Sequence, residues 1–309
     1  MGKYIRIARL DHWIKQFFIV PGIVLALVLI HPQFGVQLWI NILLGWLATC
    51  FIASSNYVIN EWLDAEFDKY HPVKKHRSVV ENDLSPKIVY AMYFSLAIMG
   101  LGISFLISIP FLVTEAALWF MGIMYNVKPF RTKDIPFFDV LSELINNAIR
   151  LLLGWFIVIA PTYTFPPISV VIGYWLAGAF LMATKRFSEY RMIGNAEQAA
   201  LYRKSFAHYS EQSLLISAFF YAMSSTLFIG IFLTRYRMEL ILFMPFYIGL
   251  FCLCFRIAYK EDSAAQKPEK LFKEKGLMLY CLLLVCLFVG LMLIDMPWLY
   301  NMISNSLLP

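Results

Sequence analysis

The chain has 309 residues, of which 60% are hydrophobic, 17% aromatic and only 15% charged. Soluble domains contain about 45–50% apolar residues, so this composition excludes an ordinary soluble protein and indicates a multi-pass membrane protein. The formal net charge is +6. The basic residues gather in short segments between apolar runs, so the charge reflects membrane topology and gives no reason to expect a nucleic-acid partner.

Apolar runs close to the roughly 20 residues that span a bilayer recur along the whole chain. They predict an all-α membrane bundle of about nine helices, and no long linker divides residues 1–309 into separate domains. The predicted spans are 14–30, 38–59, 88–108, 109–125, 137–160, 165–184, 212–234, 238–257 and 276–294.

The basic residues orient these spans. Of the 26 Lys and Arg, 23 lie before the first span, after an even-numbered span or at the adjoining span ends, and only Arg150, Arg235 and Arg237 do not. The positive-inside rule therefore predicts that the N-terminus and these segments lie on the cytoplasmic side of the inner membrane. The first run lacks a signal-peptide cleavage site and is interpreted as a first anchor.

The end of the second span carries the most informative pattern. Asn56, Asn60, Asp64 and Asp68 follow one another at steps of four, which places them on one face of a helix, and Glu61 lies beside Asn60. Mg²⁺ prefers oxygen ligands and shares them with substrate phosphates. Ionisable groups at such a depth are costly and usually functional. Asn56, Asn60, Asp64 and Asp68 are called the carboxylate ladder below. Together with Glu61 they predict a magnesium–diphosphate site at the membrane surface.

A basic segment follows the ladder directly. It contains Lys69, Lys74, Lys75 and Arg77, whose cations suit phosphate oxygens. The intervening His71-Pro72 pair is predicted to end the helix. The loop that results would fold these cations back over the ladder.

The fifth span is the most polar of the set. Asp139, Glu143, Asn147 and Arg150 lie along one of its faces, beside Asn146. Because such a face is expensive against lipid, it is predicted to line an internal cavity. The alternative is a network of hydrogen bonds and ion pairs that only holds the helices together. A basic segment with two prolines, 125–139, connects the fourth span to this one.

The sixth span ends in Lys185, Arg186 and Glu189, and Arg203 and Lys204 follow in the same inner segment. Positive-inside bias explains part of this pattern. The Lys-Arg-x-x-Glu spacing also suits a site in which one acid joins the ligands of a metal while adjacent cations bind phosphate.

These motifs resemble those of the UbiA superfamily of intramembrane transferases. The first motif of that superfamily, Asn-Asp-x-x-Asp-x-x-x-Asp, stands here as Asn60, Glu61, Asp64 and Asp68, with Glu61 in place of the usual Asp. In prenyl-transferring members an Asp cluster follows the sixth helix. The Lys185-Arg186-Phe-Ser-Glu189 run found there instead resembles the decaprenyl-phosphate phosphoribosyltransferase branch.

The resemblance implies nine helices around a central cavity that opens to the cytoplasm. It implies Mg²⁺ held by Asn60, Asp64 and Asp68, with Glu61 as a further candidate ligand. The resemblance further implies a diphosphate donor, phosphoribosyl pyrophosphate, bound by Asn56, Lys74, Arg77, Lys185, Arg186 and Glu189. A polyprenyl phosphate would enter from the bilayer as the acceptor, and Lys15, Lys204 or Arg150 would hold its phosphate.

Two alternatives stay open at this point. In the first, the same pocket ionises a prenyl diphosphate, for transfer to an aromatic or isoprenoid acceptor or for cyclisation. Asp139 and Glu143 would then replace the Asp cluster that follows the sixth helix in prenyl-transferring members. The second alternative is a transporter, against which the chain shows no inverted repeat and no pair of broken helices.

Overall fold

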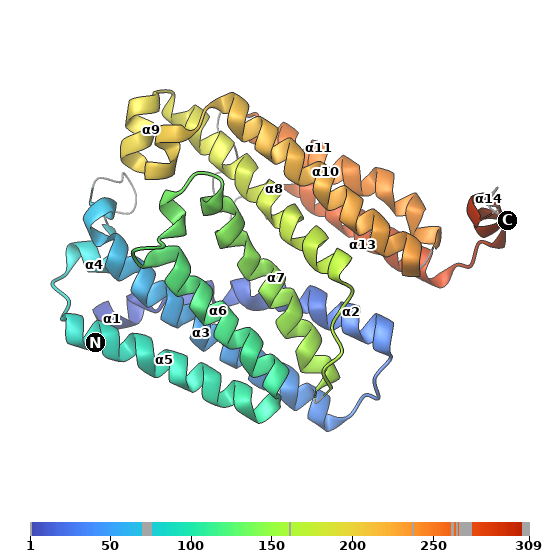
Figure 1. The fold of residues 1–309 in the computed structure, drawn as a ribbon, viewed down its shortest axis with the longest axis horizontal. Helices are drawn as coiled ribbons and strands as arrows, with labels where there is room; N and C mark the ends of the chain where they lie inside the picture. Colours follow the sequence, from blue (N-terminus) through green and yellow to red (C-terminus); the bar gives the residue numbers. More distant parts are fainter. Residues whose placement is uncertain are drawn as a thin grey trace. The chain divides into compact units, whose positions relative to one another are not determined.

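The structure, a computed structural model, describes residues 2–69, 76–160, 162–236, 238–260, 263, 265 and 274–304. These residues form helices and connecting loops, and no strand occurs among them. The elements, shown in Figure 1, are α1 (Gly2–Ile7), η1 (Leu10–Ile19), α2 (Val20–Ile30), α3 (Val36–Asp68), α4 (Ser78–Glu81), α5 (Pro86–Ile107), α6 (Ile109–Asn126), η3 (Thr132–Asp134), α7 (Phe138–Ile159), α8 (Ile168–Ile193), α9 (Ala196–Tyr202), η4 (Lys204–His208), α10 (Glu211–Tyr236), η5 (Met238–Phe243), α11 (Met244–Ala258), α13 (Lys275–Leu293) and α14 (Pro297–Ser304).

Within the described ranges, nine helical segments are long and apolar enough to cross a membrane, so the prediction of an all-α, multi-pass membrane protein is confirmed. Three spans are longer than their apolar runs. The first begins at Gly2, the second continues to Glu66 and the sixth continues to Ile193. Hydropathy locates only the apolar part of a helix, whereas the backbone hydrogen bonds continue through polar residues. The predicted helix break at His71-Pro72 falls outside the described residues.

The chain forms two compact units, and each is described by itself. The first unit comprises Met1–Pro166 with Ala200–Ala207, and the second comprises Pro167–Ala199 with His208–Pro309. The prediction that residues 1–309 make one domain stays a prediction.

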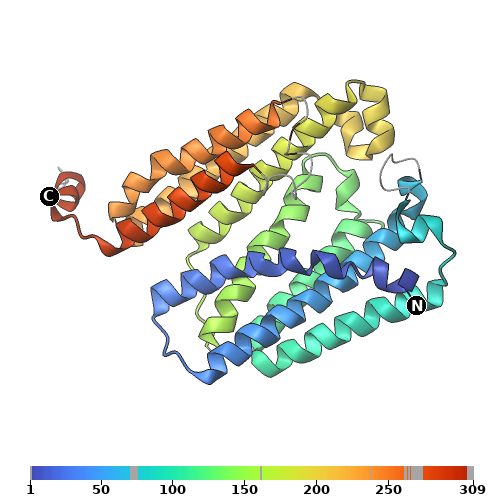
Figure 2. The same cartoon turned by 180° about the vertical axis from the view of Figure 1, so that it is seen from behind.

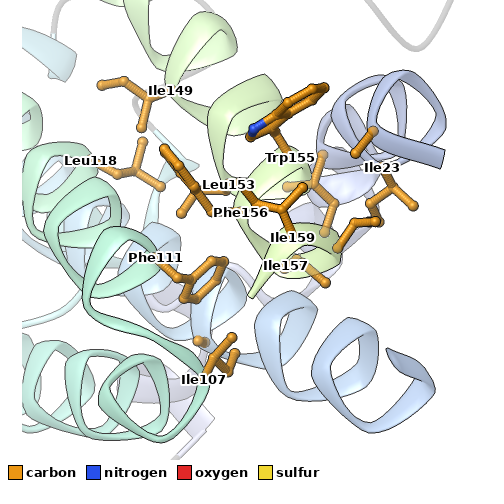
Figure 3. Close-up of a cluster of buried hydrophobic side chains, with 14 of the residues drawn as sticks. Ile23, Ile107, Phe111, Leu118, Ile149, Leu153, Trp155, Phe156, Ile157 and Ile159 are labelled. Atoms are coloured by element: carbon orange, nitrogen blue, oxygen red, sulfur yellow. The ribbon is translucent and has the colours of Figure 1, made fainter. Parts of the chain in front are cut away.

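Helix α7 is the central helix of the first unit. It packs against α2, α6, α3 and η1, and Figure 2 shows the N-terminal segment crossing it. Leu153, Phe156 and Ile157 of α7 meet Phe111 of α6 and Ile23 of α2 in one hydrophobic cluster (Figure 3). This packing removes α7 from lipid, which explains how the most polar span of the sequence is tolerated.

Two glycines allow α7 to approach the N-terminal segment closely. A Cβ atom at Gly154 would collide with the carbonyl oxygen of Ile19, and one at Gly22 would collide with the carbonyl oxygen of Leu151. Membrane helices commonly use such small residues to bring their backbones together. The crossing fixes η1 beside α7, and this contact matters for the polar residues described below.

The second unit is built on the pairing of α8 with α10, with α11 packed against both of these helices and α13 against α11. Ser225 of α10 donates a hydrogen bond of 2.8 Å to the carbonyl of Gly173 and lies 2.8 Å from the Tyr247 hydroxyl of α11. Phe180 of α8 packs its ring on Phe251 of α11. Hydroxyl contacts and aromatic packing thus hold the three helices together.

The crossing of α7 with η1 gives a first prediction. Gly154→Ala should lower the melting temperature of the detergent-purified protein, because the added methyl must displace a backbone carbonyl, and overpacking costs about 1–3 kcal/mol. Gly102→Ala is the matched control, since no atom lies within 4 Å of a Cβ there. Equal melting temperatures for the two variants would contradict the close approach.

Candidate functional site

The carboxylate ladder lies on the last turns of α3, which runs without a break to Asp68. All four ladder positions therefore share one helix, as their spacing predicts. Asp68 is buried, with 4% of its surface exposed, whereas Asn56, Asn60 and Asp64 are half-buried. The ladder thus combines one enclosed carboxylate with three side chains that retain some access.

Asn56 is fixed against α6. Its amide Nδ2 donates a hydrogen bond of 2.9 Å to the carbonyl of Leu118. The side chain fits because Gly122 has no Cβ, which would collide with the amide. The Asn56 Oδ1 atom is buried and has no hydrogen-bond partner among the described residues, so one acceptor of the ladder remains available.

Asp64 receives two cations from the segment between α6 and α7. Its Oδ1 accepts hydrogen bonds from the Lys133 ammonium and, at 3.0 Å, from the Arg131 guanidinium. The same ammonium donates at 2.8 Å to Oδ1 of Asn126, and that atom also accepts from the Asn60 amide. Oxygen atoms of Asp64 and Asn126 thus surround one positive charge.

Lys133 is almost enclosed, with 7% of its side chain exposed. Burial lowers the pKa of its ammonium below the ordinary value, and the Asp64 carboxylate opposes this by stabilising the charged form. The charge of Lys133 in this position therefore depends on its partner.

The other two acids of the first motif also have basic partners. Asp68 accepts a hydrogen bond from the Arg77 guanidinium, and Glu61 lies 3.3 Å from Arg9. Both carboxylates are about 5% exposed. Because a buried carboxylate without a counter-charge is strongly destabilised, these pairs stabilise the end of α3 and hold α1, η1 and the segment after Arg77 close to it.

The ladder offers the type of oxygen ligand that Mg²⁺ prefers. Asn60, Asp64 and Asp68 offer amide and carboxylate oxygens on one helix face. No group of three His, Cys, Asp or Glu side chains in the described part of the chain is gathered closely enough to hold a metal. The Lys133 ammonium, surrounded by carboxylate and amide oxygens, lies where a metal cation would be accommodated, so the residues fit the ion if Lys133 moves.

The polar residues of α7 enter two sets of contacts, because Arg203 lies 3.7 Å from Asp139 and donates a hydrogen bond of 3.3 Å to the Tyr125 hydroxyl. Asp139 is fully buried and accepts a hydrogen bond of 3.1 Å from Ser205, and Glu143 accepts one of 3.0 Å from the Tyr125 hydroxyl. Arg150 contacts the Asn147 amide oxygen at 3.4 Å. The predicted face exists on one helix, and Arg203 with Tyr125 links its two acids, whereas Arg150 contacts amides.

The remaining predicted residues of the first unit lie in other surroundings. Lys15 is 3.4 Å from a ring nitrogen of His12. Lys204 is exposed and lies 3.8 Å from the Asp134 carboxylate. Lys74 lies outside the described residues.

The Lys-Arg-x-x-Glu motif forms an ion-paired group in the second unit. Glu189 lies 3.8 Å from Lys185 and accepts a hydrogen bond of 3.2 Å from Arg186. Helix α8 continues to Ile193, so these residues lie on the last turns of the helix, beyond the apolar run that ends at residue 184. Their i, i+3 and i, i+4 spacings place them on one face.

Reasoning from the sequence missed Arg9, Asn126, Arg131 and Lys133 as partners of the ladder. The basic composition of the 125–139 segment was the available signal. It gave no indication of which carboxylate each cation would meet, because periodicity relates only residues within one helix.

The UbiA prenyltransferase family model matches residues 18–283. This chain belongs to the UbiA prenyltransferase family. Among curated relatives, a decaprenyl-phosphate phosphoribosyltransferase from Corynebacterium glutamicum is 28% identical over 102 residues, 33% of this chain and 30% of that protein. A digeranylgeranylglyceryl phosphate synthase from Archaeoglobus fulgidus is 32% identical over 100 residues, 32% of each chain. Both matches span only about a third of the relatives' lengths.

The fold agrees with that of the family over almost the whole chain. A UbiA homologue from Archaeoglobus fulgidus bound to DMAPP and Mg²⁺ superposes with a TM-score of 0.70 at 18% identity, covering 95% of this chain and 100% of that one. The same homologue bound to GPP and Mg²⁺ gives 0.70, with 94% of this chain covered. At this identity the likeness shows the fold.

Asn126 offers a test of the local network. Asn126→Leu should lower the melting temperature, because it removes the acceptor shared by Asn60 and Lys133 and leaves buried donors unpaired, at a cost of about 1–3 kcal/mol each. Asn82→Leu serves as the control, since the Asn82 amide makes a single bond to the Ser78 carbonyl at a short helix. A melting temperature for Asn126→Leu equal to that of the control would contradict the network.

Proposed function

We propose that this chain is a magnesium-dependent membrane transferase that uses a diphosphate-activated donor at the ladder end of α3. The observation that carries the proposal is the interleaving of acids and cations there. Asp64 is bound to Arg131 and Lys133, and Asp68 is bound to Arg77. Acids of this kind suit a metal and cations of this kind suit phosphates, so one metal–diphosphate group would satisfy both.

Asn60, Asp64 and Asp68 are the residues proposed to hold Mg²⁺. When bound, Mg²⁺ supplies positive charge that stabilises the departing diphosphate. The printed descriptions of two structural relatives name Mg²⁺ together with DMAPP or GPP, which supports metal dependence in the family.

The cations now paired with the ladder are proposed to serve the donor's phosphates. With a divalent ion beside Asp64, Arg131 and Lys133 would lose their counter-charge there and gain a new one in the diphosphate. Arg77 would serve likewise near Asp68. Within the second unit, Lys185 and Arg186 are proposed as further phosphate-binding residues, and Glu189 holds them in place.

The proposed donor is phosphoribosyl pyrophosphate and the proposed acceptor is a polyprenyl phosphate. The bond between the anomeric carbon and the diphosphate oxygen breaks, an oxygen of the acceptor phosphate bonds to that carbon, and pyrophosphate departs with the bonding electrons. No protein nucleophile is needed. Positive charge fixed around the leaving group before the reaction lowers the barrier.

The choice of donor rests on the Lys185-Arg186-x-x-Glu189 motif and on the relative named as a phosphoribosyltransferase. Prenyl transfer is the second candidate, favoured by the relative named as digeranylgeranylglyceryl phosphate synthase and by the homologue bound to DMAPP or GPP. Membership of this family argues against a transporter. The basic segments support an N-terminus on the cytoplasmic side of the inner membrane.

The deciding experiment is pyrophosphate release by the purified protein in nanodiscs, with Mg²⁺ and then with EDTA. One set of substrates is phosphoribosyl pyrophosphate with polyprenyl phosphate. The other set is prenyl diphosphates with and without an aromatic acceptor. Metal-dependent release only in the first set is expected, and release only in the second would replace the phosphoribosyl assignment with prenyl transfer.

Neutralising the ladder should remove turnover without unfolding the protein. Asp64→Asn and Asp68→Asn are each expected to reduce pyrophosphate release by at least about 100-fold, because each removes a charged ligand of the metal. Asp83→Asn, at an exposed position, is the control and should keep full activity. Full activity in both ladder variants, with intact thermal unfolding, would refute the metal-site assignment.

Lys133 should affect the metal and the donor in opposite directions. Lys133→Met is expected to tighten binding of Mg²⁺ alone severalfold, because a cation that competes for Asp64 is removed. It should raise the donor KM by about 10-fold, the value of one charged hydrogen bond. Metal-dependent thermal shifts and steady-state kinetics measure the two effects, and Lys133→Arg should restore the donor KM. An unchanged donor KM would exclude Lys133 from donor binding.

A further inference from the structure

Arg150 carries a positive charge deep in the first unit, and its direct contacts are with amide oxygens. It is about 18 Å from the start of α7 at 1.5 Å per residue. Its Nε donates a hydrogen bond of 2.9 Å to Oε1 of Gln16, and Nη1 contacts Oδ1 of Asn147 at 3.4 Å. Both partners are neutral amides. In the described part of the chain no carboxylate pairs with Arg150.

The acids of the same unit that interact with this region are bound elsewhere. Glu115, which interacts electrostatically with Arg150, is fully buried and accepts a hydrogen bond from Thr49. Glu143 accepts one from Tyr125. A charged group within a membrane span normally pairs with another charge or serves a ligand, so an arginine whose direct contacts are amides is typical of a residue that serves an anionic ligand.

A second observation points the same way. The Gln16 side chain is fully buried, yet its Nε2 has no hydrogen-bond partner in the described structure. The Gln16 amide therefore accepts from Arg150 through its oxygen and keeps its nitrogen available as a donor. Because a buried donor left unpaired costs free energy, a guanidinium beside an unpaired amide N–H is typical of a site built to receive oxygen atoms.

The ladder lies close to this pair on α3. The Tyr57 hydroxyl interacts electrostatically with Arg150, Arg9 and Glu143, and it lies next to the Gln16 side chain. Tyr57 precedes Asn60 by three residues, which is less than one helical turn. Arg150 and Gln16 are therefore near the membrane-facing end of the proposed donor site, on the side away from the solvated end of α3.

We infer that Arg150 and Gln16 bind the phosphate of the membrane-borne acceptor. The cations around Asp64 and Asp68 already serve the donor's diphosphate at the end of the span. Arg150 is surrounded by apolar helices, so a ligand that reaches it from the bilayer needs an apolar tail and an anionic head. The inference that this head is a polyprenyl phosphate rests on the proposed function.

The test measures acceptor binding without any donor, so that it does not depend on the transfer reaction. The melting temperature of the wild-type protein in detergent is measured without ligand and with each of three ligands. The ligands are polyprenyl phosphate, the uncharged polyprenol and an aromatic carboxylic acid. A ligand that binds only the folded state raises the melting temperature. The expected result is a shift with polyprenyl phosphate that exceeds the shift with polyprenol.

Arg150→Met should abolish that excess shift while leaving the polyprenol shift unchanged. Arg150→Lys should retain part of it, and Gln16→Met should weaken phosphate binding about 10-fold, the value of one charged hydrogen bond. Arg6→Met is the control, since Arg6 is exposed on α1. In turnover, Arg150→Met should raise the acceptor KM at least about 10-fold and leave the donor KM within about twofold.

Three results would overturn the inference. The first is an equal phosphate-dependent shift in wild type and Arg150→Met. The second is a lower melting temperature for Arg150→Met without ligand, combined with an unchanged acceptor KM, as a purely structural role requires. The third is an Arg150-dependent shift only with the aromatic carboxylate. Failure of the phosphoribosyl donor in the pyrophosphate assay would leave an Arg150-dependent phosphate shift intact, so the two proposals fail separately.

Discussion

The requirement that charges in a membrane bundle be compensated governs the first unit of this protein. Asp64, Asp68 and Glu61 lie at the end of a long apolar helix, and each carboxylate is bound by Lys or Arg from another segment. Removing one partner of such a pair leaves a poorly solvated charge. The pairs therefore position the loop before α7 and the N-terminal segment around the ladder, and they bring cations that suit phosphates to the same place.

The same requirement explains the role of α7. A helix with Asp139, Glu143 and Arg150 could not face lipid at acceptable cost, and it is the most deeply buried of the spans, with 67% of its apolar window inside the structure. Gly154 lets it approach η1 closely enough for Arg150 to reach Gln16. The close packing of α7 on η1 and the hydrogen bond between Arg150 and Gln16 thus depend on each other, since moving η1 away from α7 would break both.

The two proposed subsites differ in electrostatic character. The ladder has acids and bases in contact, as a site for a metal with its diphosphate requires. The Arg150 site has a cation with neutral amides and an unpaired donor, as a site for a lone anion requires. A reaction between a charged water-soluble donor and a lipid acceptor needs this separation, because the two substrates arrive from different solvents.

The sequence by itself determined the membrane spans, the family resemblance and the position of the ladder on one helix face. These features follow from local periodicity and composition, which relate residues a few positions apart. Only the tertiary structure decided the partners: Lys133 lies 69 residues from Asp64, Asn126 lies 66 from Asn60, and Gln16 lies 134 from Arg150. Helix packing brings such residues together, and hydropathy does not predict which distant residues will meet. For the same reason α3 and α8 continue beyond their apolar runs, since backbone hydrogen bonding persists where hydropathy has already fallen.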